Sequence, residues 1–386
     1  MLEFLYSLTL IEVVIGGGGR MAGFSPVSVR GVLASICCLV ALLDFMKGGA
    51  RVSPDTKILI FLFVFCVVLG AFVGYASGND IGAVMGDVAQ VSFFMTIIFF
   101  QRCFDYKKTF SLTDRFLVYS TVGMAVCYLV VLFFIFEMGK FDPIYQFLST
   151  GDDFFFRENG TFFYKGFPYL GVALFFLVER INIWKLIGLV IVGAAILLCN
   201  TRGMYLAIAI TVFLLYFRVE VKFFVIVFAV IVFLFWGEGQ MLGAVAKPDS
   251  DVVRLQDLTY IFDDMNFFSV VFGHGFGAEI NGRNRIEIAW AEVFYKQGLV
   301  GLGFWLYWVF SLSSYFISLR GWVRKVARPY FASALFIFAL SFTNPFMNNS
   351  IGLVVLLVAH FSLVYLRGQQ YRMLSEENRL RRDVEC

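Results

Sequence analysis

The side chains best suited to chemistry are four arginines that stand where basic residues are otherwise sparse. Arg202, in NTRGMYLAI, lies between two apolar runs, where a charge is costly to insert into a membrane. Arg254, in DVVRLQDL, and Arg283 and Arg285, in NGRNRIE, follow in one long polar stretch. A guanidinium offers a planar fork of donors that matches phosphate oxygens. These arginines therefore favour binding of a diphosphate, although each also fits an anchor that fixes the depth of a helix.

Carboxylates near these arginines are candidates for acid–base chemistry. Glu287 follows the arginine pair directly. It could act as a general base, or it could pair with Arg283, four residues earlier, if one helix carries both. Glu292 is the next candidate. An adjacent pair, Asp152 and Asp153, could bind a metal, but with two histidines and no cysteine spacing typical of metal centres we expect no metal site.

A glycine-rich segment, FGHGFGAE, follows in the same stretch and contains His274 and Gly275. Glycines permit positive φ and close approach of a backbone, so we expect these two residues to contact the substrate. The segment does not follow a predicted strand, and GGGG at 16–19 lacks the Lys-Ser/Thr of a P-loop. Neither is a nucleotide-binding fingerprint, and we expect no cofactor.

The elements that position these residues are membrane helices. The chain of 386 residues is 60% hydrophobic and only 15% charged, and its mean hydropathy is +0.81. Soluble domains carry roughly 25% charged residues. Apolar runs of about 20 residues recur along the chain, each long enough to cross a hydrocarbon core. The runs are continuous rather than alternating, so the sequence predicts an all-α, polytopic membrane helical bundle and not a β-barrel.

About twelve transmembrane helices are predicted, the first of them in place of a cleavable signal peptide. They span roughly 2–16, 28–46, 57–76, 81–100, 115–137, 165–179, 183–200, 203–217, 222–237, 298–319, 329–344 and 350–366. One set of connections, with the C-terminal tail, holds 20 of the 31 Lys and Arg residues, and the alternate set holds 11. The basic set should face the cytoplasm, with both termini.

The opposite, periplasmic side then carries two sizeable stretches, 138–165 and 238–297. The second is the large periplasmic loop, and its last part should form a short helix broken near Gly298 and Gly301. We expect one transmembrane domain over 1–366 and a charged cytoplasmic tail over 367–386.

Three segments, in order, resemble the superfamily of O-antigen ligases and polymerases, membrane glycosyltransferases of a GT-C-like fold. NTRGMYLAI has Arg202 and Leu206 in the family's R-x3-L spacing, and VVRL precedes the G-x-G of FGHGFGAE. IEIAWAEVFYKQGLVGLGF resembles the segment that ends in G-x-x-G. The motifs cover roughly 200–305. The ligases carry a histidine eleven residues before the first glycine of G-x-x-G, where this chain has Glu287, and this difference favours a polymerase.

The resemblance implies an inverting, metal-independent polymerase that joins glycan repeat units linked to undecaprenyl diphosphate. Arg202 and Arg254 would neutralise the diphosphate, Glu287 would act on the acceptor hydroxyl, and Arg283 and Arg285 would bind substrate. The expected partners are these lipid-linked glycans, the bilayer of the inner membrane, a chain-length regulator and a flippase, with no nucleic acid. Two alternatives stay open: a ligase that moves glycan onto lipid A core, and a lipid-linked oligosaccharide flippase.

Overall fold

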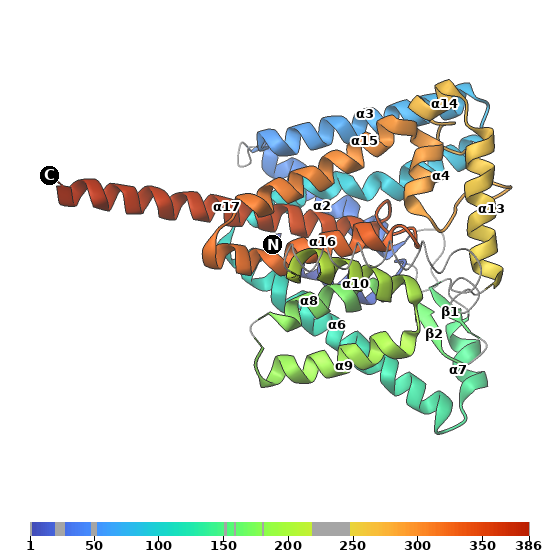
Figure 1. Cartoon of the computed structure of the whole chain (residues 1–386), viewed down its shortest axis with the longest axis horizontal. Helices are drawn as coiled ribbons and strands as arrows, with labels where there is room; N and C mark the ends of the chain where they lie inside the picture. Colours follow the sequence, from blue (N-terminus) through green and yellow to red (C-terminus); the bar gives the residue numbers. More distant parts are fainter. Residues whose placement is uncertain are drawn as a thin grey trace, which may run out of the picture.

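A computed structural model of the chain describes residues 2–19, 28–47, 52–149, 153–157, 160–179, 181–217 and 248–385. Nearly all of this part is helical, and one two-stranded hairpin, β1–β2, supplies the strands within it (Figure 1). The elements are α1 (Leu2–Ile15), α2 (Val29–Met46), α3 (Pro54–Ala76), α4 (Ile81–Val91), the 3₁₀ turn η1 (Ser92–Thr96), α5 (Ile97–Phe104), α6 (Lys107–Phe136), α7 (Phe141–Leu148), β1 (Phe154–Phe156), β2 (Phe162–Tyr164), α8 (Pro168–Val178), α9 (Ile183–Cys199), α10 (Arg202–Tyr216), α13 (Pro248–Asp264), α14 (Phe267–Phe272), α15 (Ala289–Ser318), α16 (Gly321–Leu340) and α17 (Ser350–Glu385).

Six helical segments of the described chain are long and apolar enough to cross a membrane, and three shorter apolar helices accompany them. The six are Val29–Met46, Pro54–Ala76, Ile81–Phe104, Lys108–Phe136, Ala289–Ser318 and Ser350–Glu376. The predicted fold class, an all-α polytopic membrane protein, is therefore confirmed. The predicted span at 222–237 lies outside the described residues, so the total of about twelve stays a prediction.

Helix α17 lies in the middle of the bundle, and its C-terminal half projects from one end (Figure 1). In its most apolar 18-residue window, 78% of the residues are buried. The corresponding share is 22–50% in the other five candidate spans. It packs against α15, α16 and α5. Its burial follows from a run of apolar residues, IGLVVLLVA, that is hydrophobic on every face.

The two ends of the bundle differ. Helices α7, α13 and α14 and the β1–β2 hairpin gather at the end opposite the projecting part of α17 (Figure 1). Glu3, near the start of α1, pairs with Lys108 (2.7 Å) at the start of α6. Helix α1 ends beside the hairpin, where the Gly18 amide donates to Asp153 (3.1 Å). The described parts of the two polar stretches predicted to share one side of the membrane thus lie together at one end of the molecule.

A break at Gly298 divides α15, as the sequence predicts. Gly298 has φ 62°, and a Cβ there would lie 2.3 Å from the carbonyl oxygen of Val271, at the end of α14. Only glycine tolerates both the conformation and the approach. The first part of the helix begins at Ala289 rather than near Ile286. The residues before Ala289, which include Glu287, are therefore non-helical.

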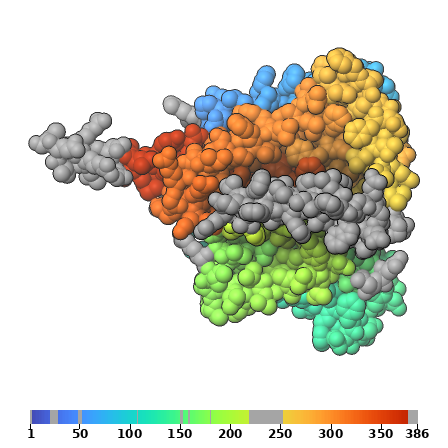
Figure 2. All heavy atoms as spheres, viewed as in Figure 1, coloured from blue at the N-terminus to red at the C-terminus, as the bar shows by residue number. Residues whose placement is uncertain are grey.

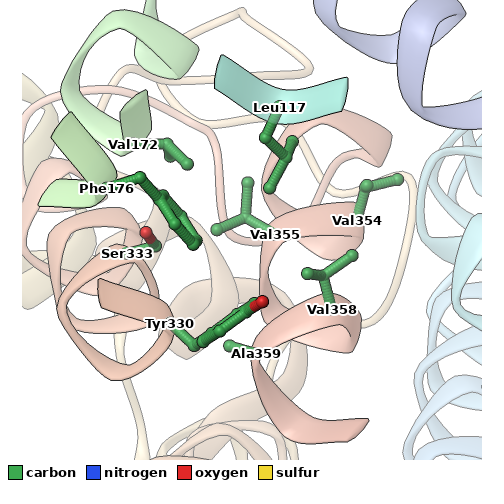
Figure 3. Close-up of a pocket in the computed structure, with 9 residues that line it drawn as sticks. All are labelled: Leu117, Val172, Phe176, Tyr330, Ser333, Val354, Val355, Val358 and Ala359. Atoms are coloured by element: carbon green, nitrogen blue, oxygen red, sulfur yellow. The ribbon is translucent and has the colours of Figure 1, made fainter. Parts of the chain in front are cut away.

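A small void lies in the core between α6, α8, α16 and α17, and Figure 3 shows the residues that line it. Its volume is about 10 Å³, and its walls are almost entirely apolar. A space of this size holds at most about one water molecule. It is a packing defect of the bundle and is too small for a sugar.

Candidate active site

A cavity of about 990 Å³ opens at the end of the bundle that carries α13 and the hairpin. We call it the cationic cavity. Its walls come from the hairpin region (155–165), the start of α10 (200–203), Arg254 of α13, residues 283–287, and the turn between α16 and α17 (344–351). Figure 2 shows α13 and α14 in yellow as the outer surface at this end of the molecule.

Charge sets this cavity apart from the void in the core. Among the described residues, six basic side chains line it: Arg157, Lys165, Arg202, Arg254, Arg283 and Arg285. Glu287 is the single acidic residue on the same described walls. The structure thus brings together five of the seven residues to which the sequence analysis assigns a catalytic or substrate-binding role, from segments up to 85 positions apart.

Arg202 owes its place to a sharp end of α9. Asn200 adopts the left-handed conformation (φ 46°, ψ 47°), which ends α9, and Thr201 is extended, so Arg202 is the first residue of α10. The unpaired amides and the dipole of a helix N-terminus favour negative charge. A Cβ at Gly203 would lie 2.3 Å from the Thr343 hydroxyl, so glycine lets α10 approach the turn after α16. The guanidinium and the helix end together present positive charge to the cavity.

Arg157 and Lys165 are cavity residues that the sequence analysis missed. Arg157 donates to the carbonyl oxygen of Asn200 and to Thr201 Oγ1 (3.1 Å), so it ties the hairpin to the start of α10. Lys165 pairs with the buried Asp153 (3.2 Å). The available signal was their placement: both flank an aromatic run in the smaller predicted periplasmic stretch.

Arg254 and Glu287 form an ion pair inside the cavity. Arg254 Nε lies 2.7 Å and a terminal nitrogen 2.5 Å from Glu287 Oε2, and Arg254 also donates to the Thr343 carbonyl (3.4 Å). The Glu287 side chain is 50% exposed. The alternative pairing of Glu287 with Arg283 is wrong, because no helix joins them and Arg283 instead pairs with Asp257 of α13.

A buried charge cluster fixes the backbone that carries Arg283 and Arg285. Lys296 Nζ lies 2.8 Å from Asp87 of α4 and 3.2 Å from Glu292, and it donates to the carbonyl of Asn284 (2.6 Å). All three charged side chains are less than 10% exposed. Glu292 is therefore a partner of Lys296 rather than a wall of the cavity. The lysine holds the peptide between the two cavity arginines against α4.

His274 and Gly275 lie outside the cavity walls. The imidazole of His274 stacks on Tyr295 (ring centroids 4.4 Å apart), with Nε2 3.5 Å from Asp264. Gly275 has φ 83°, and a Cβ there would meet the backbone of Gly74 at 2.0 Å. The glycine-rich segment thus packs tightly against α3. The structure does not bring these two residues to the other candidates, and their contact with substrate stays a prediction.

The donors of the cavity suit an anion rather than a metal. Hard metal cations bind oxygen ligands, whereas the charged groups on these walls are mainly guanidinium and ammonium groups, which repel cations. Asp153 is occupied by Lys165 and by the Gly18 amide, and Asp152 lies outside the described residues. Within the part of the chain that the structure describes, no three His, Cys, Asp or Glu side chains are grouped for a metal ion.

Comparison with known proteins agrees with this chemistry. No family model and no solved structure matches the chain. It is 28% identical over 363 residues to a protein of Shigella flexneri named O-antigen polymerase, and the alignment covers 90% of each chain. This chain resembles an O-antigen polymerase. The match spans nearly the whole of both proteins and so confirms the predicted resemblance, and with it an enzyme of the membrane glycosyltransferase kind.

Proposed function

We propose that the chain joins glycan repeat units carried on undecaprenyl diphosphate into a surface polysaccharide of the O-antigen type. The observation that carries the proposal is the cationic cavity, in a membrane protein similar over 90% of its length to an O-antigen polymerase. The donor is the growing glycan on its lipid diphosphate, and the acceptor is the non-reducing end of one lipid-linked repeat unit. The leaving group is the lipid diphosphate itself, so no sugar nucleotide takes part.

The arginines act on the leaving group. When the bond between the donor sugar C1 and the diphosphate oxygen breaks, negative charge grows on that oxygen. Donors fixed in advance around a developing charge supply the largest share of catalysis in many enzymes. Arg202, aided by the N-terminus of α10, and Arg254, which the turn after α16 holds in place, are the residues we assign to it. Arg283 and Arg285 bind the substrates' other anionic oxygens.

Glu287 acts on the acceptor. Its carboxylate accepts the proton of the acceptor hydroxyl while that oxygen bonds to C1 on the face opposite the diphosphate, which inverts the configuration. Arg254 pairs with Glu287 and also faces the leaving group in this scheme, so one guanidinium connects the base with the diphosphate. The six cationic side chains provide the charge neutralisation that a metal ion supplies in other transferases, and we propose that the reaction needs none.

We assign the cavity to the periplasmic face of the inner membrane. Two facts support this: the hairpin, α13 and α14 share one end of the bundle, and the projecting, charged part of α17 leaves the other end. The basic connections and both termini would then be cytoplasmic. The transmembrane domain would cover 1–366, with the tail 367–386 on the cytoplasmic side. A flippase would deliver the substrates, and a chain-length regulator would limit the product.

Deletion of the gene tests the function through the lipopolysaccharide that the cell makes. Lipid A core capped with a single repeat unit, restored to a full ladder by the intact gene, is the expected result. Unsubstituted core together with retained polymer would instead show a ligase. Repeat units trapped on the cytoplasmic side would show a flippase.

A further inference from the structure

Both strands of the β1–β2 hairpin consist entirely of aromatic residues. Its register pairs Phe154 with Tyr164, Phe155 with Phe163, and Phe156 with Phe162. Successive side chains of a strand point to opposite faces, so Phe155 and Phe163 share one face and the other four share the opposite one. The burial agrees: Phe162 and Tyr164 are 3% and 4% exposed, whereas Phe155 is 52% exposed.

The buried face of the hairpin has a structural role. Phe162 packs edge-on against Tyr128 of α6, with ring centroids 5.0 Å apart. The Tyr164 hydroxyl donates to the carbonyl of Ile15, at the end of α1, and burial raises the pKa of this phenol, so it stays protonated and keeps the hydrogen bond. These contacts fix the hairpin on the bundle. Phe154 stacks on Tyr164 and Phe156 packs against Tyr145 of α7, with ring centroids 4.9 Å apart in each pair, and Phe156 also reaches the cavity wall.

The other face lines the cationic cavity, although Phe163 also packs edge-on against Phe167, with ring centroids 5.6 Å apart. Phe155 and Phe163 both stand in its wall, with ring centroids 6.4 Å apart and tilted by 40°. Cations border this pair: Lys165 Nζ lies 5.7 Å from the centre of the Phe155 ring, and Arg157 follows β1 directly. An apolar surface of two rings beside cationic groups is thus open to whatever fills the cavity.

We propose that Phe155 and Phe163 form a platform on which a sugar ring of the lipid-linked glycan stacks. This inference rests on the proposed function and adds to it a glycan subsite separate from the arginines that take the diphosphate. A pyranose presents a face of C–H bonds, whose hydrogens carry partial positive charge, and the face of an aromatic ring is negative. Its hydroxyl groups lie around the ring edge, where Lys165 and Arg157 can bind them.

A prenyl chain is the other apolar occupant that this surface could take. It fits less well. Asp153, Asn200 and Thr201 take up only some of the donor hydrogens of Lys165 and Arg157, and a hydrocarbon would remove water from the others without offering an acceptor, which is costly. A sugar satisfies both parts of the wall at once. Small-molecule sites commonly combine an apolar wall with a few polar groups that fix the orientation of the ligand.

The test measures glycan binding directly, without turnover. The probe is the repeat-unit oligosaccharide released from the lipid-linked precursor of the strain that carries the gene, and its contact with the purified full-length protein is followed by saturation-transfer NMR. The variants are Phe155→Ala, Phe163→Ala and Phe155→Leu, which keeps apolar bulk but has no ring. Phe267→Ala is the matched control, because Phe267 is 89% exposed on α14 and does not line the cavity. Thermal unfolding in detergent confirms that each variant is folded.

The platform predicts that each alanine variant weakens oligosaccharide binding about 3- to 10-fold, the usual worth of one aromatic contact. Phe155→Leu should lose as much, and Phe267→Ala nothing. Unchanged binding in folded Phe155→Ala and Phe163→Ala protein overturns the proposal. So does Phe155→Leu with full affinity. Weaker binding of undecaprenyl phosphate by the alanine variants, with unchanged oligosaccharide binding, also overturns it, because the surface would then be a prenyl groove. This test measures binding without polymer formation. A negative result would therefore exclude the platform but would not affect the deletion test of the polymerase function.

Discussion

Replacing Glu287 by glutamine separates two roles that the structure allows this residue. Glutamine keeps the size and polarity of the side chain but removes the charge and the basicity. If Glu287 only holds Arg254, the loss is that of an ion pair whose members are 50% and 27% exposed. Such pairs are worth about 0.2–1 kcal/mol, which corresponds to at most roughly a fivefold change in rate. If Glu287 is the base, turnover should fall by about 10²–10⁴. The two ranges do not overlap.

The assay follows polymer made by purified protein from lipid-linked repeat units under saturating substrate. We expect a fall of at least 100-fold for Glu287→Gln, with donor binding retained. The same change in an Arg254→Gln background serves as the control. If Glu287 is the base, the double variant should turn over far more slowly than Arg254→Gln alone. If Glu287 only positions Arg254, the two variants should have the same rate. A single variant within fivefold of the wild-type rate would refute the assignment of the base.

Three further predictions concern the arginine, the topology and the buried cluster. Arg202→Ala should lower polymer formation by about 10²–10³, as the loss of one donor to a developing charge does. Arg202→Lys should retain only part of the activity, because lysine lacks the planar fork. Full activity of the alanine variant would show that Arg202 only anchors its helix. A cysteine placed at Ser250 should be labelled from outside intact cells and one at Ser375 should not, relative to the unmodified chain; the reverse pattern would invert the assigned topology. Lys296→Met leaves two buried carboxylates without their cation and should destabilise the protein by about 3–5 kcal/mol. The measurement is the unfolding temperature in detergent, which should fall. The control, Lys108→Met, breaks an exposed ion pair and should change this temperature little.

The sequence predicted the helices well because the membrane demands a local signal. Each apolar run has to satisfy its own backbone within the segment, so length and composition suffice to find it. The break at Gly298 was also local, since glycine marks it in the sequence. The hairpin was not predicted as strands: FFF and FFY are each three residues long and pair across a turn, and nothing in them distinguishes a strand from an aromatic loop.

The sequence identified several residues of the site, but it did not predict which of them contact one another. Scarcity of basic residues outside the predicted cytoplasmic loops pointed to Arg202 and Arg254, and both line the cavity. The partner of Glu287 could not be found in this way, because it lies 33 residues earlier on a separate helix. Arg157 was missed for the same reason: its contacts are with the cap of α10, 43 and 44 residues later. Sequence spacing reports on neighbours within one helix, whereas this cavity is assembled between elements.

The central position of α17 also bears on how the protein is made. The turn that precedes this helix and its first residues supply one wall of the cavity, and the helix is the most buried of the six candidate spans. It also follows the other five candidate spans along the chain, so it is synthesised after them. Helices enter a bilayer as separate units before they associate. The earlier spans therefore lack their central packing partner until α17 is inserted. The cavity is then closed only after α17 has been inserted, and a chain cut short before Ser350 would have neither its middle helix nor a whole site.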